Sequence, residues 1–141
     1  MPQFPMEFRT QVTATSDPQA TWKSFAGESP VTCAIPPEFA GPGGGASPED
    51  LYALALTNCF VATFKVFAAR AKLEFADLIA ETTLTVERNE KGFPWMSRLL
   101  IQIKLRGAVD REKTRELLEK TTKQCMVIES TKTKVDFEFN L

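Results

Sequence analysis

Residues 51–72 are the segment that most limits how this chain can fold. Their pattern predicts a long helix, but Leu, Ala, Phe and Val occur on every face of it. A helix that is apolar all round must be buried on most of its sides. A chain of 141 residues has little material to surround such a helix, so we expect a second chain to cover part of it.

The start of this helix is marked by several signals that agree. Ser47 suits the N-cap and Pro48 suits the first helical position. Glu49 and Asp50 then complement the positive end of the helix dipole. Pro and Gly dominate the preceding residues 36–46, so that segment is expected to be a loop whose three consecutive glycines indicate mobility or a close backbone approach.

Strand patterns lie on both sides of the helix. The expected strands are residues 6–15, 20–25 and 30–35 before it, and residues 78–90, 97–107 and 133–141 after it. In the first strand, Met6, Phe8, Val12 and Ala14 share a face that we expect to be half-buried.

Asp110 is expected to cap a second helix over residues 111–125. The order is three strands, a long helix, a hairpin of two strands, a helix and a strand. We therefore predict an α+β fold in a single domain, residues 1–141.

Charge and terminal composition exclude several classes of protein. The net charge is −1, with Lys and Arg scattered among Asp and Glu, which argues against a nucleic-acid interface and a membrane-surface protein. The N-terminus does not resemble a signal peptide. Polar residues interrupt the longest apolar stretch, so a membrane span is not expected. We expect a cytoplasmic protein, in which cysteines are normally reduced.

The chain contains no histidine, so the commonest general base and metal ligand is missing. Its three cysteines, Cys33, Cys59 and Cys125, lack the spacing of a metal site. Cys59 and Cys125 each fall on a predicted helix, 66 positions apart. Most free cysteines are small core residues, but two of these thiols could instead be catalytic or redox-active.

Two motifs resemble a known family. The stretch "GASPEDLYALALTNCF" and the later stretch "KQCMVIESTKTKVDFEF" resemble the superfamily of osmotically inducible protein C and the organic hydroperoxide resistance proteins. In that family a Pro-Glu-x-Leu element opens a central helix and a cysteine follows roughly two and a half turns later. The resemblance covers residues 40–141 well, and the order of elements extends it over the whole chain.

The resemblance implies an intertwined homodimer in which the central helices pack against the sheets and the active sites lie at the subunit interface. Cys59 matches the family's peroxidatic cysteine and Cys125 matches its resolving cysteine. Glu49 matches a glutamate that helps to orient an arginine beside the reactive thiolate. The implied function is a peroxidase for organic hydroperoxides that uses no metal and no flavin. A small dithiol, such as a lipoyl group, is the implied reductant.

This chemistry is intelligible from the residues. A thiolate attacks a hydroperoxide and becomes a sulfenic acid, a second thiol condenses with it to form a disulfide, and an external thiol restores both. A cation that lowers the thiol pKa would replace histidine. Phe60 and Phe64 are expected to line an apolar pocket that favours organic hydroperoxides over hydrogen peroxide.

The chain departs from the family pattern at two points. No basic residue lies in the loop 36–46, so the family's arginine is not evident, and Arg9 and Lys23 are the candidate replacements. Cys125 is followed by Met126 instead of proline. The alternative function is therefore a non-catalytic member of the fold that binds an apolar small ligand at the dimer interface. A thiol-dependent hydrolase or transferase is a weaker alternative, because no histidine can pair with a cysteine.

Glu49 lies ten residues before Cys59, which on a continuous helix is about 15 Å of rise. The carboxylate therefore cannot serve the thiol of its own helix directly. We predict that it serves the thiol of the partner chain. The alternatives are that the helix breaks between the two residues, or that Glu49 only complements the helix dipole.

Overall fold

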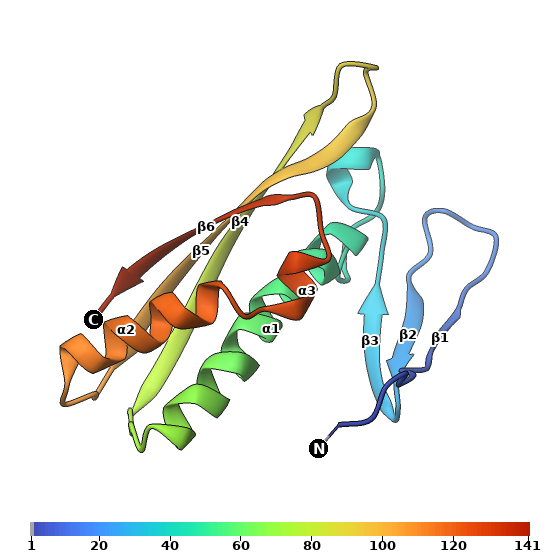
Figure 1. The fold of residues 1–141 in the computed structure, drawn as a ribbon. Helices are drawn as coiled ribbons and strands as arrows, with labels where there is room; N and C mark the ends of the chain where they lie inside the picture. The colour runs from blue at the N-terminus through green and yellow to red at the C-terminus, as the bar shows by residue number, and fades with distance from the viewer. Residues whose placement is uncertain (1) are drawn as a thin grey trace. The chain divides into compact units, whose positions relative to one another are not determined.

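The structure is a computed structural model that describes residues 2–141. Its elements, in chain order, are β1 (Thr10–Thr13), β2 (Trp22–Ala26), β3 (Ser29–Cys33), η1 (Pro37–Phe39), α1 (Pro48–Arg70), β4 (Asp77–Arg88), β5 (Pro94–Arg106), α2 (Arg111–Thr122), α3 (Met126–Glu129) and β6 (Lys134–Asn140) (Figure 1). This is the α+β order expected from the sequence. The chain divides into two compact units between Leu51 and Tyr52, and the expectation of a single domain stays a prediction.

The first unit contains an antiparallel sheet in the order β1-β2-β3. β1 is shorter than the strand expected over residues 6–15, and all four of its residues are exposed. The expected half-burial of its apolar face was wrong for this chain, since Val12 is 61% exposed and Phe8 is 85% exposed. The physical reason is that three strands and a loop provide no second layer within this unit.

The glycine-rich loop returns to β3 by a close backbone approach. The backbone N–H of Ala46 donates to the Thr32 carbonyl at 2.8 Å, and that of Ala34 donates to the Ala46 carbonyl at 3.1 Å. A Cβ atom on Gly45 would lie 2.9 Å from the carbonyl carbon of Cys33, closer than real side chains approach. Glycine is therefore required at this position, which ties the start of α1 to β3.

Helix α1 begins with Ser47 at its N-cap, as predicted, and Asp50 completes the cap with a return bond that was not predicted. The Asp50 backbone N–H donates to Ser47 Oγ, and the Ser47 backbone N–H donates to Asp50 Oδ2, both at 3.0 Å. These reciprocal bonds satisfy backbone donors that a helix start otherwise leaves free.

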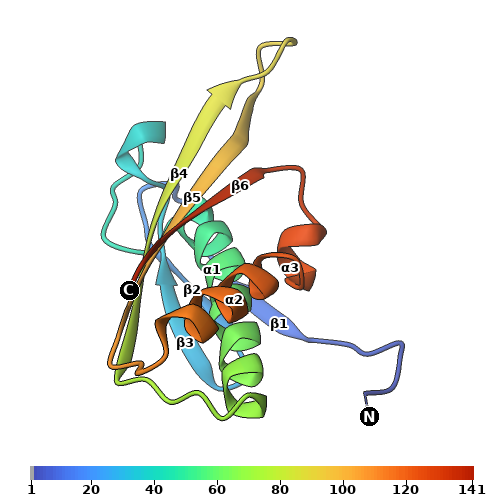
Figure 2. The same cartoon turned by 60° about the vertical axis from the view of Figure 1, so that its left-hand side comes forward.

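The second unit contains a sheet in the order β4-β5-β6, in which β4 and β5 are antiparallel and β5 and β6 are parallel. The predicted hairpin and the predicted final strand are thus confirmed. Figure 2 shows α1 and α2 on the same face of this sheet. The fully buried large side chains between these layers are Leu56, Phe60, Phe64, Leu99, Ile101, Ile103 and Leu118. Each such burial stabilises the fold by about 1.5–3 kcal/mol.

Helix α1 has one face in this core and another that stays apolar and open. Ala53, Leu56, Phe60 and Phe64 face the core, whereas Leu54 is 50% exposed. By length and composition alone α1 could cross a membrane, as many core helices could. The exposed apolar face is the part of the helix that we expected a second chain to cover, and the dimer itself stays a prediction.

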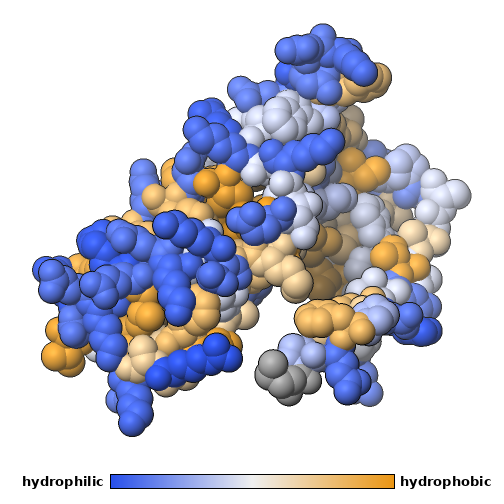
Figure 3. Space-filling model, in the orientation of Figure 1, coloured by the Kyte–Doolittle hydropathy of each residue, from blue (hydrophilic) through white to orange (hydrophobic). Residues whose placement is uncertain are grey.

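Helix α2 carries polar side chains on its outer face, which forms a hydrophilic surface in Figure 3. Asp110 is its N-cap, as predicted, and accepts a bond from the Lys113 backbone N–H at 3.0 Å. The expected extent to Cys125 was wrong, because α2 ends at Thr122. The chain leaves the helix there and buries Cys125 and Ile128 in the core.

Candidate thiol site

Cys59 lies about three turns into α1. Its side chain is half-buried and packs against the same core cluster that contains Cys125. Helix packing therefore fixes the direction of this thiol while part of the residue stays accessible. A thiol that must meet a substrate from outside needs this combination.

Cys125 lies in the connection between α2 and α3 and is completely buried. Its backbone is extended, with φ −94° and ψ 102°, and it occupies the N-cap position of α3 without capping through its side chain. The thiol donates to the carbonyl of Thr121 at 3.1 Å. The expectation that Cys125 belongs to a helix is therefore corrected: it lies at a bend between two helices.

The structure brings Cys59 and Cys125 together. Cys59 packs against the buried cluster that contains Cys125, and Cys59 and Thr63 both act on the Cys125 pKa. All three cysteines of the chain are reduced. The two thiols that the sequence singled out thus form one site within the second unit.

Burial raises the pKa of Cys125 from its ordinary value of 9.0 to about 11. Desolvation is the largest cause, and the charge of Cys59, a hydrogen bond to Cys59 and the charge of Glu129 add to it. The Thr63 hydroxyl opposes these effects and lowers the pKa, as a donor to a thiolate does. Cys125 therefore carries its proton at neutral pH, which suits a thiol that reacts second.

Glu49 lies in the first turn of α1. One of its carboxylate oxygens, Oε2, is buried and has no hydrogen-bond partner among residues 2–141. Helix α1 is continuous from Pro48 to Arg70. Glu49 and Cys59 are therefore separated by about 15 Å along the helix axis, as expected for an unbroken helix. A buried carboxylate oxygen without a donor is costly, so this position is suited to a donor from outside the chain.

The two candidate cations make other contacts in the first unit. Arg9 pairs with Glu7 at 3.2 Å, and the side chains of both are largely exposed. Lys23 donates from Nζ to Thr32 Oγ1 at 2.5 Å. Within the described chain, neither Arg9 nor Lys23 is bonded to Glu49. The charges that act on the Cys125 pKa are those of Cys59 and Glu129, and both are negative. The role of Arg9 or Lys23 beside the thiol stays a prediction.

Phe60 and Phe64 are core residues in the single chain. Both are completely buried. The Phe60 ring lies 5.0 Å from the Phe137 ring, and the Phe64 ring lies 5.6 Å from the Phe75 ring, measured between centroids. These rings support α1 on the sheet behind Cys59, and their expected role in lining a substrate pocket stays a prediction.

Cys33 is not part of this pair of thiols. It is buried at the end of β3, and its sulfur lies 3.3 Å from Ser24 Oγ within the first unit. This is the core position that its strand pattern suggested.

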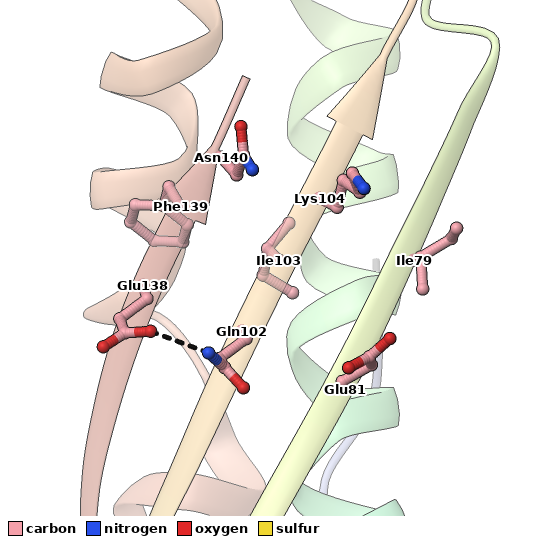
Figure 4. Close-up of a pocket in the computed structure, with 8 residues that line it drawn as sticks. All are labelled: Ile79, Glu81, Gln102, Ile103, Lys104, Glu138, Phe139 and Asn140. Carbon is pink, nitrogen blue, oxygen red and sulfur yellow. Dashed lines mark hydrogen bonds between the residues drawn. The ribbon is translucent and has the colours of Figure 1, made fainter.

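A groove of about 440 Å³ lies on the sheet of the second unit, on the face that carries the exposed residues of β4, β5 and β6. Figure 4 shows the hydrogen bond that Gln102 donates to Glu138 Oε2 across it, at 2.8 Å. Cys59 and Cys125 belong to the opposite, helix-covered face, so the groove is separate from the thiol site.

Residues 2–141 contain no group of three or more His, Cys, Asp or Glu placed to hold a metal ion.

Sequence reasoning missed two features around the thiols. Thr63 lies one turn after Cys59, and that spacing is a signal that could have found it. Tyr52 lies two turns before Cys59, and its hydroxyl is 2.5 Å from Thr133 Oγ1, which itself donates to the Met96 carbonyl at 2.8 Å. No local pattern links Tyr52 to a residue 81 positions away.

Solved structures of several bacterial proteins share this fold. An OsmC-like protein of unknown function from Vibrio cholerae superimposes with a TM-score of 0.82 at 18% identity, covering 96% of this chain and 99% of that one. The organic hydroperoxide resistance protein OsmC from Legionella pneumophila gives 0.75 at 17% identity, covering 99% and 100%. The organic hydroperoxide resistance protein OhrB of Bacillus subtilis gives 0.72 at 22% identity, covering 94% and 98%.

At these identities the structural likeness concerns the fold. The family model for OsmC-like proteins matches residues 41–140 of this chain. That match contains α1 with Cys59, the sheet of the second unit and the bend with Cys125. The chain belongs to the family of OsmC-like proteins.

Proposed function

We propose that this protein is a cysteine-based peroxidase that reduces organic hydroperoxides to alcohols. The observation that carries the proposal is the packing of a half-buried thiol, Cys59, against the core cluster that contains a fully buried thiol, Cys125, in the second unit. Two relatives of the same fold are named for organic hydroperoxide resistance, which supports this substrate class. A cytoplasmic location, which we also propose, would keep the resting thiols reduced.

The proposed cycle begins at Cys59. Its thiolate attacks one peroxide oxygen, the O–O bond breaks, and the alkoxide leaves as the alcohol after it takes up a proton. Cys59 is then a sulfenic acid. The Cys125 sulfur attacks the Cys59 sulfur, an S–S bond forms, and the hydroxide that leaves takes the Cys125 proton to become water. An external dithiol reduces the disulfide by thiol exchange and becomes a disulfide itself.

The proposal includes a homodimer. The exposed apolar face of α1 and the exposed apolar side chains of β1 are surfaces that a second copy can cover. A donor from that copy would satisfy the buried oxygen of Glu49. The arrangement is consistent with the prediction that Glu49 acts across the interface.

Peroxide consumption tests the function. The reduced protein is mixed with cumene hydroperoxide or hydrogen peroxide, with dihydrolipoamide or dithiothreitol as the reductant. We expect faster consumption of cumene hydroperoxide, and no consumption above background by Cys59→Ser. Equal rates for the wild-type protein and Cys59→Ser would end the peroxidase proposal.

A second candidate function rests on the charges that surround the thiol site within residues 2–141. The charges that act on the Cys125 pKa are both negative, and Arg9 and Lys23 have other partners. A non-catalytic protein that binds an apolar small ligand at the dimer interface would need no such cation. Binding of an apolar fluorescent probe that is unchanged by Cys59→Ser, together with absence of peroxide consumption, would favour this alternative.

A further inference from the structure

The hydroxyl of Tyr52 joins helix α1 to the connection between α3 and β6. It lies 2.5 Å from Thr133 Oγ1, and the Thr133 hydroxyl donates to the Met96 carbonyl at 2.8 Å. A hydroxyl carries a single proton, so Thr133 accepts a hydrogen bond from Tyr52 and gives one to Met96. Thr133 is buried. The two bonds therefore fix it between α1 and β5.

Thr133 ends a short segment, residues 125–133, that begins at Cys125. We call it the Cys125 segment. The backbone N–H and the hydroxyl of Thr131 both donate to the Ile128 carbonyl, at 3.1 and 2.9 Å, so the chain after α3 turns back on that helix. Cys125 and Ile128 are buried in the core. The segment is thus one compact turn, with Cys125 held at its first residue and Thr133 at its last.

Tyr52 and Cys59 lie on the same face of α1. They are seven residues apart, which is two turns and about 10 Å of rise, so their side chains point to the same side of the helix. Both pack against the core cluster that contains Cys125. One face of α1 therefore carries the first thiol of the proposed cycle and the hydroxyl that holds the far end of the Cys125 segment.

We propose that Tyr52 is a positioning residue: through Thr133 it holds the Cys125 segment in the core, and so keeps the Cys125 sulfur where it can close a disulfide with Cys59. The inference rests on the proposed function for its role in turnover. Without the Tyr52 hydroxyl, Thr133 keeps its bond to Met96 but loses its tie to α1. A buried oxygen is then left without a donor, and the segment opens more often.

The first test measures how often Cys125 becomes accessible, without any redox chemistry. In a Cys33→Ser/Cys59→Ser background Cys125 is the remaining cysteine of the chain, and N-ethylmaleimide labels it. We expect Tyr52→Phe to raise the labelling rate about fivefold, the size expected for one hydrogen bond. Low concentrations of urea should leave this rate nearly constant, because release of a short segment exposes little surface.

Further variants show whether the hydrogen bond is responsible. Thr133→Val should be labelled as fast as Tyr52→Phe, and the double variant should be labelled no faster. Thr133→Ser keeps the hydroxyl and should be labelled at close to the wild-type rate. Thr57→Val is the matched control from the same helix, because its buried hydroxyl donates to the Ala53 carbonyl within α1. It should also be labelled at the wild-type rate.

The second test measures disulfide closure without any hydroperoxide. In a Cys33→Ser background, the reduced protein is treated with dithiodipyridine, a neutral disulfide. Cys59 displaces a first thiopyridone and forms a mixed disulfide. The Cys125 sulfur then attacks the Cys59 sulfur, the S–S bond between them forms, and the second thiopyridone leaves with the Cys125 proton. Tyr52→Phe should leave the first release unchanged and slow the second about fivefold, and peptide mapping identifies the sulfurs joined at each stage.

Equal labelling, or an equal second release, in Tyr52→Phe and the wild-type protein overturns the inference. Labelling of Tyr52→Phe that rises steeply with urea overturns it as well, because the hydroxyl would then stabilise the whole fold and not the segment. Fast labelling of Thr133→Ser or Thr57→Val has the same consequence, as does absence of a second release in the wild-type protein. The expected labelling and closure without peroxide consumption would refute the proposed function and leave the role of Tyr52 intact.

Discussion

Cys59 packs against the core cluster that contains Cys125, although the two residues are 66 positions apart in the chain. Cys59 reaches this cluster from the long helix α1, and Cys125 reaches it from the bend between α2 and α3. One of the thiols is half-buried and the other is fully buried. In the proposed cycle, this difference in access suits Cys59 to the first reaction and Cys125 to the second.

The first prediction concerns the loss of the second thiol. Cys125→Ser should still reduce one equivalent of hydroperoxide, because Cys59 reacts first. Without a thiol to close the disulfide, the Cys59 sulfenic acid stays open to a second oxidation to sulfinic acid. Intact-protein mass spectrometry after several equivalents of cumene hydroperoxide should show two added oxygens on Cys125→Ser and a disulfide in the wild-type protein. The same mass for both proteins would count against the division of roles.

The second prediction concerns stability at alkaline pH. The folded protein holds the Cys125 proton more tightly than the unfolded chain does, because the pKa rises from 9.0 to about 11 on folding. Below pH 9 both states are protonated and this contribution to stability is fully present. It is lost as the pH rises toward about 11, since the unfolded state then binds fewer protons.

Urea denaturation at about pH 8 and about pH 10.5 should therefore show this loss. We expect it to be about 2 kcal/mol larger for the wild-type protein than for Cys125→Ala. Parallel pH dependences for the two proteins would contradict the burial effect on Cys125.

The third prediction concerns the link between Tyr52 and Thr133. The Tyr52 hydroxyl lies 2.5 Å from Thr133 Oγ1, and Thr133 is buried and also bonds the Met96 carbonyl. Tyr52→Phe should lower the free energy of unfolding by about 1 kcal/mol. In a cycle with Thr133→Val the two changes should not be additive, because they share one hydrogen bond. Additive effects in urea denaturation would indicate that the two hydroxyls do not interact.

The fourth prediction concerns the dimer and Glu49. A mixed dimer pairs a wild-type chain with a Glu49→Ala/Cys59→Ser chain, so only the wild-type Cys59 remains. If Glu49 acts across the interface, that thiol faces the mutated residue 49, and peroxide consumption should be nearly lost. The control dimer pairs a wild-type chain with a Cys59→Ser chain and should keep about half of the activity, since one of two sites survives. Equal activities for the two dimers would place Glu49 beside the thiol of its own chain or outside the site.

Local signals in the sequence predicted most elements of the fold. The Ser47 cap, the Asp110 cap and the hairpin all follow from short patterns that the structure contains. The alternation in β6 likewise separates its half-buried residues from its exposed ones. These features depend on neighbours along the chain, which a sequence displays directly.

Features set by distant contacts were harder to predict. The end of α2 at Thr122 has no glycine or proline to mark it, and burial of Cys125 and Ile128 in the core accompanies the bend. The effect of Thr63 on the Cys125 pKa likewise depends on where two separate segments meet. The sequence pattern identified both thiols but not this hydroxyl.

Disulfide mapping after one equivalent of cumene hydroperoxide shows directly which cysteines form the redox pair. The protein is oxidised, the remaining thiols are alkylated under denaturing conditions, and the peptides are identified by mass spectrometry. We predict that the main product contains a Cys59–Cys125 disulfide within one chain and an alkylated Cys33. A main disulfide that contains Cys33, or three cysteines that all remain free thiols, would contradict it.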